Sequence, residues 1–240
     1  MQYFCLHTAS SIFFARCRDG KRSFNSFEYN FDLVFVVTVF PSILAKLCKE
    51  YNLKHFIHLS ALGINDAVDS DYAKSKLEGE NEILKNFPLA TILRPSIVYS
   101  VEDKFSTSFM TLLNRLPFFP LYYGGSTRFA PIHCSDLTDT IHYVITNNIY
   151  SKIIECVGPE IITFREILEK LLQLIEKKRI LLPLPLPIAN LSARFFEILP
   201  SPLITRDQLR LLKYDNIPSG KYKTNSEIGI PAKRYFDDEV

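Results

Sequence analysis

The stretch that decides the fold is KHFIHLSALGINDAVDSDYAKSKLEGENEILKNFPLATILRPSIVY, residues 54–99. It opens with a short β-type run, Lys54–Ser60, and closes with another, Leu89–Tyr99. Between these runs, a polar loop leads into a helical pattern from about Tyr72 to Phe87, which Pro88 ends. A strand, a helix and a strand in this order require parallel pairing and a right-handed crossover. The stretch therefore predicts half of a doubly wound parallel sheet.

The residues before this stretch predict one helix and one strand. Apolar residues recur at helical spacing from Pro41 to about Asn52, and proline is favoured in the first turn of a helix. The run Asp32–Phe40 is rich in β-branched and aromatic residues and predicts a buried strand. Residues 1–40 give no other clear element.

The residues after the stretch predict two helices by their first turns. Asp136 is the expected N-cap of the first, because its carboxylate accepts hydrogen bonds from free backbone N–H groups. Thr163 and Glu166 have the spacing of a capping box and open the second.

The composition suggests where the chain divides. It becomes rich in proline and leucine after Asn148. We therefore expect an α/β fold with a doubly wound, Rossmann-like domain over residues 1–148, incomplete at its start and atypical over residues 1–40, followed by a smaller α/β domain over residues 149–240.

The charge and cysteine content exclude several classes of protein. The 28 basic and 26 acidic residues are spread along the 240-residue chain and give a net charge of +2, so nucleic acid is not an expected partner. The five cysteines are odd in number and form no CxxC pair, which fits neither a disulfide framework nor a zinc ribbon. This usage favours a reducing, cytoplasmic-type compartment.

Two uncharged runs raise the question of a membrane. Leu33–Ala45 and Ile180–Ala193 are both shorter than the roughly 20 residues that a spanning helix needs, so no transmembrane segment is expected. A secretory signal is not expected either, because no basic residue precedes the apolar start of the chain. The segment Lys177–Arg194 combines basic residues with an apolar run, which suits peripheral contact with an anionic membrane or a partner subunit. A packing loop of the smaller domain explains the same segment slightly better.

Ser60, Tyr72 and Lys76 are the candidate catalytic residues. Ser60 follows a predicted strand, and Tyr72 and Lys76 share one face of the next helix. A nearby ammonium is expected to lower the pKa of the Tyr72 phenol, so that it exchanges a proton with a carbonyl or alcohol held by Ser60. A Tyr-x-x-x-Lys spacing arises about once by chance in such a chain, however, and a solvated helix face explains it equally well. The histidines and cysteines show no cluster that predicts a metal site.

Four segments in order add a resemblance to a known family. They are His58–Gly63, Tyr72–Glu80, Leu93–Tyr99 and Phe129–Leu137. Together they resemble the extended and atypical short-chain dehydrogenase/reductase superfamily. Within it, the chain is most similar to the nucleotide-binding accessory subunits of respiratory complex I, over about Pro41 to Ile230, including the segments Leu203–Gln208 and Leu212–Asn216.

The resemblance implies an NAD(P) cofactor and assigns residues to it. Tyr72 and Lys76 would contact the nicotinamide ribose, with Leu59 and Ser60 beside the same pocket. The nicotinamide ring would be covered by Pro95, Ser96 and Ile97. The smaller domain would close over this end of the cofactor and serve substrate or partner contact.

The chain departs from the superfamily at its glycine-rich turn, which binds the cofactor pyrophosphate. Gly20 is the sole glycine among the first 62 residues, so no GxxGxxG motif precedes the stretch described above. Gly20–Phe27 resembles the family's segment just before the helix at Pro41, which makes Leu33–Phe40 look like additional sequence. We therefore expect a fold truncated at its start, with NAD(P) binding that is weakened or lost.

Three hypotheses about function remain open at this point. The first is a structural or weakly catalytic accessory subunit that assembles with complex I subunits, peripheral on the inner-membrane face, or on the mitochondrial matrix face in a eukaryote. The second is a free-standing NAD(P)-dependent reductase or epimerase that uses Ser60, Tyr72 and Lys76. The third is a degenerate fragment that no longer binds cofactor.

Overall fold

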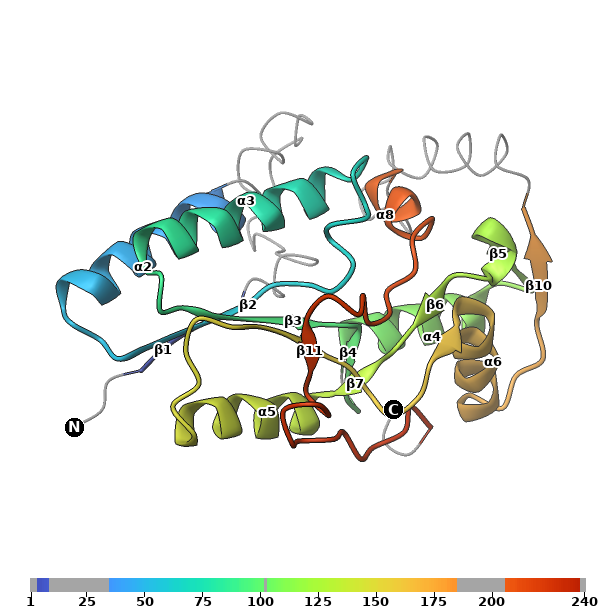
Figure 1. Cartoon of the computed structure of the whole chain (residues 1–240). Helices are drawn as coiled ribbons and strands as arrows, with labels where there is room; N and C mark the ends of the chain where they lie inside the picture. Colours follow the sequence, from blue (N-terminus) through green and yellow to red (C-terminus); the bar gives the residue numbers. More distant parts are fainter. Residues whose placement is uncertain (1–3, 9–34, 102, 185–205, 238–240) are drawn as a thin grey trace, which may run out of the picture.

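A five-stranded parallel sheet forms the centre of the computed structural model, which describes residues 4–8, 35–101, 103–184 and 206–237 (Figure 1). The strand order is β1-β2-β3-β8-β11, and each neighbouring pair is parallel. The strands are β1 Phe4–Thr8, β2 His55–Leu59, β3 Thr91–Pro95, β8 Ile153–Cys156 and β11 Lys223–Thr224.

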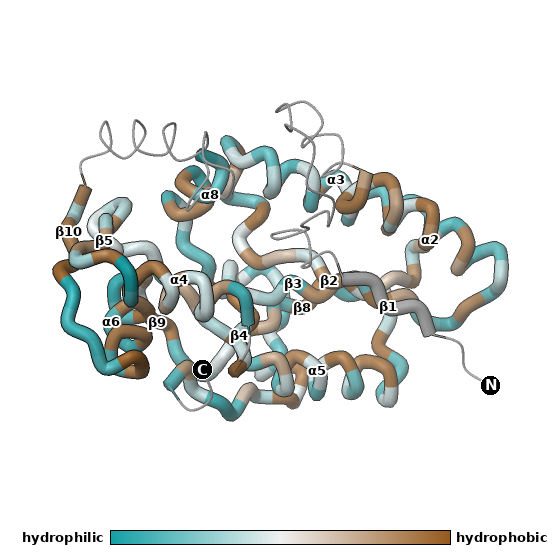
Figure 2. Tube along the Cα trace, turned by 180° about the vertical axis from the view of Figure 1, so that it is seen from behind, coloured by the Kyte–Doolittle hydropathy of each residue, from teal (hydrophilic) through white to brown (hydrophobic). Residues whose placement is uncertain are grey.

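Helices cover both faces of this sheet. On one face lie α2, Phe40–Glu50, and α3, Asp71–Asn86, and on the other lies α5, Cys134–Thr146 (Figures 1 and 2). Successive residues of a strand point to opposite faces, so Phe56 packs with α2 and α3 while Ile57 packs with α5. Because both faces are covered, β2 and β3 are buried along their whole length. The predicted doubly wound α/β fold, and the strand, helix and strand of residues 54–99, are confirmed.

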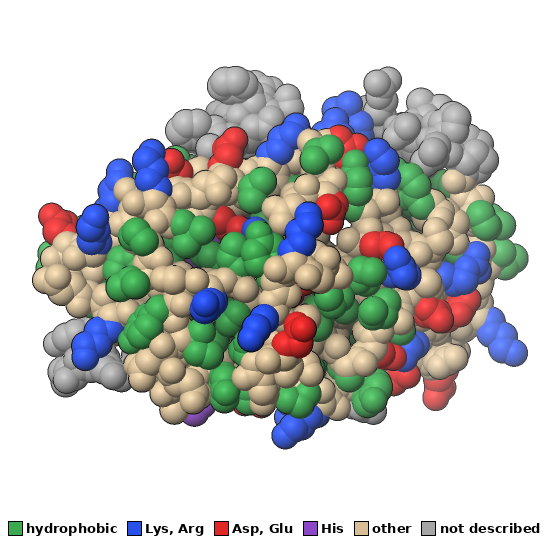
Figure 3. Space-filling view, viewed as in Figure 1, with side chains coloured by type: hydrophobic (Ala, Val, Ile, Leu, Met, Phe, Trp, Pro, Cys, Tyr) green, Lys and Arg blue, Asp and Glu red, His purple; other side chains and the backbone are tan. Residues whose placement is uncertain are grey.

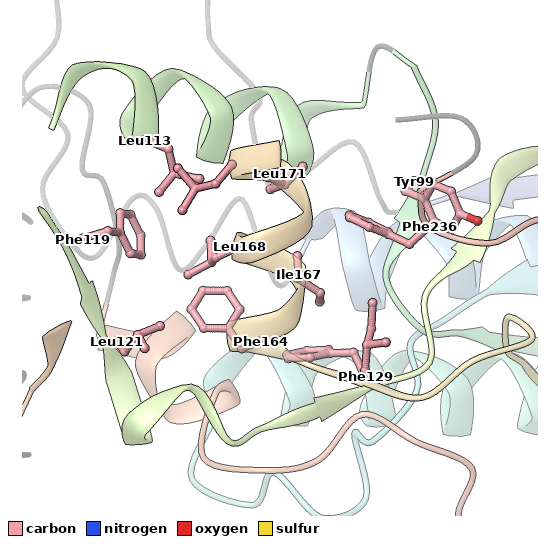
Figure 4. Packing of buried hydrophobic residues seen from close by; sticks show 12 residues of the cluster. Tyr99, Leu113, Phe119, Leu121, Phe129, Phe164, Ile167, Leu168, Leu171 and Phe236 are labelled. Carbon is pink, nitrogen blue, oxygen red and sulfur yellow. The ribbon is translucent and has the colours of Figure 1, made fainter. Parts of the chain in front are cut away.

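A second hydrophobic core lies beside the sheet. It is built by α4, Lys104–Arg115, β5, Phe118–Leu121, and α6, Phe164–Leu174, and β10, Ile180–Pro183, pairs with β5. Figure 4 shows Leu168 and Phe164 of α6 pointing toward Phe119 and Leu121. The predicted capping box at Thr163 and Glu166 is confirmed at the start of α6.

The remaining elements are short. They are the π-helix η2 Phe35–Val39, the 3-10 helix η3 Tyr122–Gly125, α8 Arg206–Leu211, β4 Val98–Tyr99, β6 Arg128–Phe129, β7 Ile132–His133 and β9 Ile162–Thr163. Residues from both sides of Asn148 build the second core, and β8 and β11 complete the main sheet. The division into residues 1–148 and 149–240 remains a proposal.

The strand predicted over Asp32–Phe40 is wrong for the residues that the structure describes. Phe35–Val39 is η2, a helical turn that runs directly into α2. Two contacts with α3 favour this conformation over the β preference of the valines: Thr38 Oγ1 donates to the Ser75 carbonyl at 3.0 Å, and the missing side chain of Gly79 lets the Val37 carbonyl approach. Strand β1, at Phe4–Thr8, was not predicted.

The N-cap predicted at Asp136 is also wrong. His133 caps α5, with its Nδ1 accepting from the Ser135 backbone N–H at 3.2 Å. Asp136 lies buried in the first turn and accepts hydrogen bonds from the backbone of Lys233 and Arg234 and from the Arg234 guanidinium. It anchors the C-terminal segment to the body of the fold.

The surface mixes charges of both signs. Lysine and arginine side chains lie among aspartate and glutamate on the face shown in Figure 3. Among the described residues, no helix is both long and apolar enough to cross a membrane. The structure describes the basic and apolar segment Lys177–Arg194 only as far as residue 184. Within the described part, Arg179 Nε donates to the Leu113 carbonyl of α4 at 2.9 Å.

Candidate functional site

The candidate site begins at the carboxyl ends of β2 and β3, the edge where ligands bind in open α/β sheets. The Ser60 backbone N–H donates to the Leu93 carbonyl at 2.7 Å and the Leu62 N–H to the Pro95 carbonyl at 2.9 Å, so the chain leaving β2 stays beside β3. The Ser60 side chain is 5% exposed, and its Oγ has no hydrogen-bond partner among the described residues. A buried hydroxyl of this kind retains its capacity to bind a ligand oxygen.

Helix α3 brings Tyr72 and Lys76 to this edge. Ser70 caps the helix, which places Tyr72 in its first turn and Lys76 in the next. The Lys76 ammonium donates to the Leu59 carbonyl at 3.3 Å and lies 5.7 Å from the centroid of the Tyr72 ring. Leu59, Tyr72 and Lys76 therefore meet, and the approach of the Ser60 hydroxyl to Tyr72 remains a prediction.

Burial dominates the ionisation of both α3 side chains. It lowers the pKa of Lys76 to about 8, while the Glu80 carboxylate one turn away raises it. Burial also raises the pKa of Tyr72 above its ordinary value, so the lowering expected from the ammonium is wrong for this structure. Desolvation of the phenolate outweighs the effect of a cation beside the ring. At neutral pH Tyr72 is therefore an uncharged phenol.

A buried ion pair fixes α3 against β3 below this site. Arg94 donates from Nε and Nη2 to the two carboxylate oxygens of Glu80, at 2.9 and 2.5 Å. Both side chains are almost fully buried, and the guanidinium lies 4.9 Å from the centroid of the Tyr222 ring. Removing one partner alone would leave a buried charge, so the pair holds the two elements in register.

Asn216 ties together the loops around the expected nicotinamide position. Ser96 Oγ donates to its Oδ1 at 2.6 Å, and its Nδ2 donates to the Leu62 carbonyl at 2.7 Å. Its side chain lies against Gly63, whose positive φ and close approach require glycine. Of the other residues predicted to cover the ring, Pro95 is buried in β3 and Ile97 packs against the second core. Their contact with a cofactor remains a prediction.

Asp207 of α8 holds the start of α3. Its carboxylate accepts from the backbone N–H groups of Asp71 and Tyr72, at 2.9 and 3.1 Å, and from Ser70 Oγ at 2.9 Å. A carboxylate is stabilised here because the first N–H groups of a helix are free and the helix dipole is positive. The C-terminal segment thus positions the turn that carries Tyr72.

Sequence reasoning missed Asp207, Asn216 and the Glu80–Arg94 pair as site residues. Asp207 and Asn216 lie more than 100 residues from their partners along the chain, so no local spacing identifies them. Glu80 had a weak signal, since it lies one turn after Lys76 on the same helix face. In the described part of the chain, no three His, Cys, Asp or Glu side chains gather where a metal ion could bind.

Comparisons with known proteins agree with the fold and add relatives. No protein-family model matches the chain. NADH dehydrogenase [ubiquinone] 1 alpha subcomplex subunit 9 of Arabidopsis thaliana is 30% identical over 188 residues, covering 73% of this chain and 47% of that protein. The protein of the same name from Dictyostelium discoideum is 31% identical over 144 residues, covering 60% and 40%. The chain spans about half the length of the curated relatives it matches.

A solved structure shares the architecture at lower identity. UDP-glucuronic acid 4-epimerase from Bacillus cereus, in complex with UDP-glucuronic acid and NAD, superposes with a TM-score of 0.60 at 18% identity. The match covers 86% of this chain and 65% of the epimerase, and it is a likeness of fold. These matches show that the chain is a homologue of the NADH dehydrogenase alpha subcomplex subunit 9 proteins and has a Rossmann-like α/β fold.

Proposed function

We propose that this chain is an NAD(P)-binding, structural or weakly catalytic protein that assembles with complex I subunits. The observation that carries the proposal is the buried Ser60 hydroxyl, which has no partner among the described residues and lies at the strand edge beside Leu59, to which Lys76 is bonded. A buried polar group without a protein partner needs another partner, such as a ligand or an ordered water. The relatives carry the name of NADH dehydrogenase subunits, and the epimerase of the same fold binds NAD.

The chain's own residues suit the nicotinamide half of a dinucleotide. An ammonium has three N–H donors, and Lys76 uses one on Leu59, which leaves two for ribose hydroxyls. Tyr72, kept neutral by burial, would donate from its phenol to a ligand oxygen, and Ser60 would hold the same oxygen. Pro95, Ser96 and Ile97 would cover the ring, with Ser96 fixed by Asn216. When bound, the nicotinamide would supply hydride chemistry.

We propose that this binding is weak. Dinucleotides gain much of their affinity from a pyrophosphate held at a helix N-terminus by a glycine-rich turn. The motif GxxGxxG does not occur in this sequence, so the nicotinamide contacts would act without it. Weak binding favours a structural role, in which the nucleotide site contributes to assembly. A location at the inner-membrane face, with peripheral contact through Lys177–Arg194, belongs to the same proposal.

A second candidate function is a free-standing reductase or epimerase, which would use Ser60, Tyr72 and Lys76. The observation that favours it is that the Lys76 ammonium lies beside both the Tyr72 ring and the carbonyl of Leu59, the residue before Ser60. In that case Tyr72→Phe would abolish turnover and leave nucleotide affinity nearly intact, because the substitution removes only the proton-transfer group.

Calorimetric titration of the purified chain with NADH and with NADPH tests the proposal. We expect saturable binding at millimolar concentrations, which Ser60→Ala weakens several-fold and the exposed control Ser226→Ala leaves unchanged. The absence of any saturable binding would refute the cofactor site. Micromolar or tighter binding would instead refute the argument that the glycine-rich turn dominates affinity.

A further inference from the structure

The chains that leave β2 and β3 stay paired for only a short distance. Among the described residues, the last backbone hydrogen bond between them runs from the Leu62 N–H to the Pro95 carbonyl, at 2.9 Å. Each chain then turns into a loop, here called the β2 loop, residues 61–63, and the β3 loop, residues 96 and 97. Open α/β proteins bind ligands outside the carboxyl ends of their strands. The spacing of these two loops therefore shapes the candidate site.

The Asn216 side chain bridges the two loops just past the end of their pairing. Its Oδ1 accepts a hydrogen bond from Ser96 Oγ at 2.6 Å, and its Nδ2 donates to the Leu62 carbonyl at 2.7 Å. The Ser96 hydroxyl also accepts from the Ala130 N–H at 3.3 Å. A hydroxyl has one proton, and the short bond to Asn216 uses it. Ser96 would therefore act on a cofactor through its position in the loop and not by donating from its hydroxyl.

The backbone of Asn216 is held from the other side by β6 and the residue after it. The Asn216 N–H donates to the Arg128 carbonyl at 2.7 Å, and its carbonyl accepts from the Ala130 N–H at 3.2 Å. Phe129, which lies between these two residues in the chain, is buried in the second hydrophobic core. The second core thus fixes the place of Asn216. A side chain that is itself held in this way can impose a geometry on the groups that it contacts.

We propose that Asn216 is a positioning residue of the nucleotide site and sets the spacing between the β2 and β3 loops around the nicotinamide. This inference rests on the function proposed above and extends it to a residue of the C-terminal part of the chain. Ser60 lies two residues before Leu62, and Ile97 directly follows Ser96, so the segments expected to meet the cofactor are bonded to one amide. Loops that are ordered before binding favour affinity, because the ligand does not have to order them.

An NADH titration followed by isoleucine and leucine methyl NMR signals tests the proposal. Asn216→Ala should weaken NADH binding about fivefold, the equivalent of one hydrogen bond. Asn86→Ala is the matched control and should leave binding unchanged. The Asn86 amide also joins two elements, since it donates to Ser42 of α2 and to the Glu82 carbonyl of α3, but it lies at the other end of α3 from Tyr72. Thermal unfolding gives the temperature below which each variant is folded.

A double-mutant cycle separates positioning from a purely structural role. Ser96→Ala removes one of the hydrogen bonds that Asn216→Ala removes, so the combined loss of NADH affinity should be smaller than the sum of the two single losses. A purely structural role would lower the unfolding temperature and leave the affinity of the folded protein unchanged.

The conservative variant Asn216→Asp separates the two sides of the bridge without any nucleotide. It keeps the acceptor for Ser96 but sets a carboxylate oxygen against the Leu62 carbonyl, where the wild type has a donor. In the free protein, it should shift the Leu62 methyl signals and leave those of Ile97 near their wild-type positions. Asn216→Ala should shift both.

The outcomes distinguish this proposal from the cofactor site on which it rests. NADH binding that Asn216→Ala leaves unchanged, or fully additive losses in the cycle, would overturn the positioning role and leave the cofactor site standing. No NADH binding by the wild type would refute the cofactor site and this proposal with it. If Asn216→Ala does not fold, Asn216→Asp and Ser96→Ala each remove one of the two hydrogen bonds, and unchanged NADH affinity in both would overturn the proposal.

Discussion

Replacing Lys76 with methionine should remove a pH dependence of stability that the wild type shows between pH 8 and 10. Burial lowers the pKa of this lysine in the folded protein to about 8, from an ordinary value of 10.5. Between these values the unfolded chain binds more protons than the folded one, so the free energy of unfolding rises as the pH rises. Below pH 8 the lysine is charged in both states, and the whole cost of burying the ammonium is present.

The size of this effect follows from the shift in pKa. A difference of about 2.5 units at about 1.36 kcal/mol per unit gives roughly 3 kcal/mol. Lys76 is 1% exposed, so solvent does not screen this energy. Methionine has a similar volume and no charge, but it loses the hydrogen bond to the Leu59 carbonyl, worth about 1 kcal/mol. We therefore expect Lys76→Met to be more stable than the wild type by about 2 kcal/mol at pH 7.

Urea unfolding at a series of pH values from 7 to 10, under reducing conditions, measures both quantities. The stability of the wild type relative to Lys76→Met should rise over this range. Burial also raises the pKa of the Cys156 thiol above its ordinary value of 9.0, which destabilises both proteins alike as the pH rises, so the difference between the two isolates Lys76. Lys74→Met is the control, because Lys74 lies on the same helix with its side chain 57% exposed, and it should keep the wild-type slope. A Lys76→Met variant whose stability changes with pH as that of the wild type does would refute the reasoning.

Three further substitutions test contacts at the site and elsewhere in the fold. Gly158→Ala should destabilise the fold by about 3 kcal/mol in urea unfolding, because a Cβ would overlap the Pro131 carbonyl; a neutral result would mean that the loop shifts freely. Arg94→Met should cost about 3 to 5 kcal/mol by leaving Glu80 charged and buried, and Arg94→Met with Glu80→Met should recover most of it in a double-mutant cycle. Asp207→Asn should cost about 1 kcal/mol in thermal unfolding by weakening the cap on α3, whereas the exposed Asp237→Asn should cost less. Equal losses from these two would contradict the capping role.

The two central strands, β2 and β3, could be predicted because their signals are local, whereas β1, β8 and β11 were not predicted. The β-type runs around Ile57 and Leu93, with a capped helix between them, leave one connection that satisfies both handedness and burial. Tyr72 and Lys76 could be placed near the end of β2 for the same reason, since α3 is the next element after β2, whereas Leu59 was assigned through the family resemblance. The sequence could not predict whether the pKa of Tyr72 is raised or lowered, because that depends on how deeply the phenol is buried.

The remaining errors come from contacts between distant residues. The valines before Pro41 favour a strand on their own, but the close approach allowed by Gly79 and the Thr38 hydrogen bond favour a helical turn. The Asp136 carboxylate could cap a helix, but in the structure it accepts hydrogen bonds from Lys233 and Arg234 of the C-terminal segment instead. Such competition for one side chain is visible only once the chain is folded.

Methyl NMR in the presence of NADH tests the central claim most directly, because it locates even a weakly bound cofactor. With selectively labelled isoleucine and leucine methyl groups, NADH should shift the signals of Leu59 and Ile97 saturably. The signals of Ile161 and Leu182, exposed residues away from this strand edge, should stay in place. Saturable shifts at Ile161 or Leu182 with Leu59 and Ile97 unmoved, or no shifts at millimolar NADH, would contradict a nicotinamide site at the ends of β2 and β3.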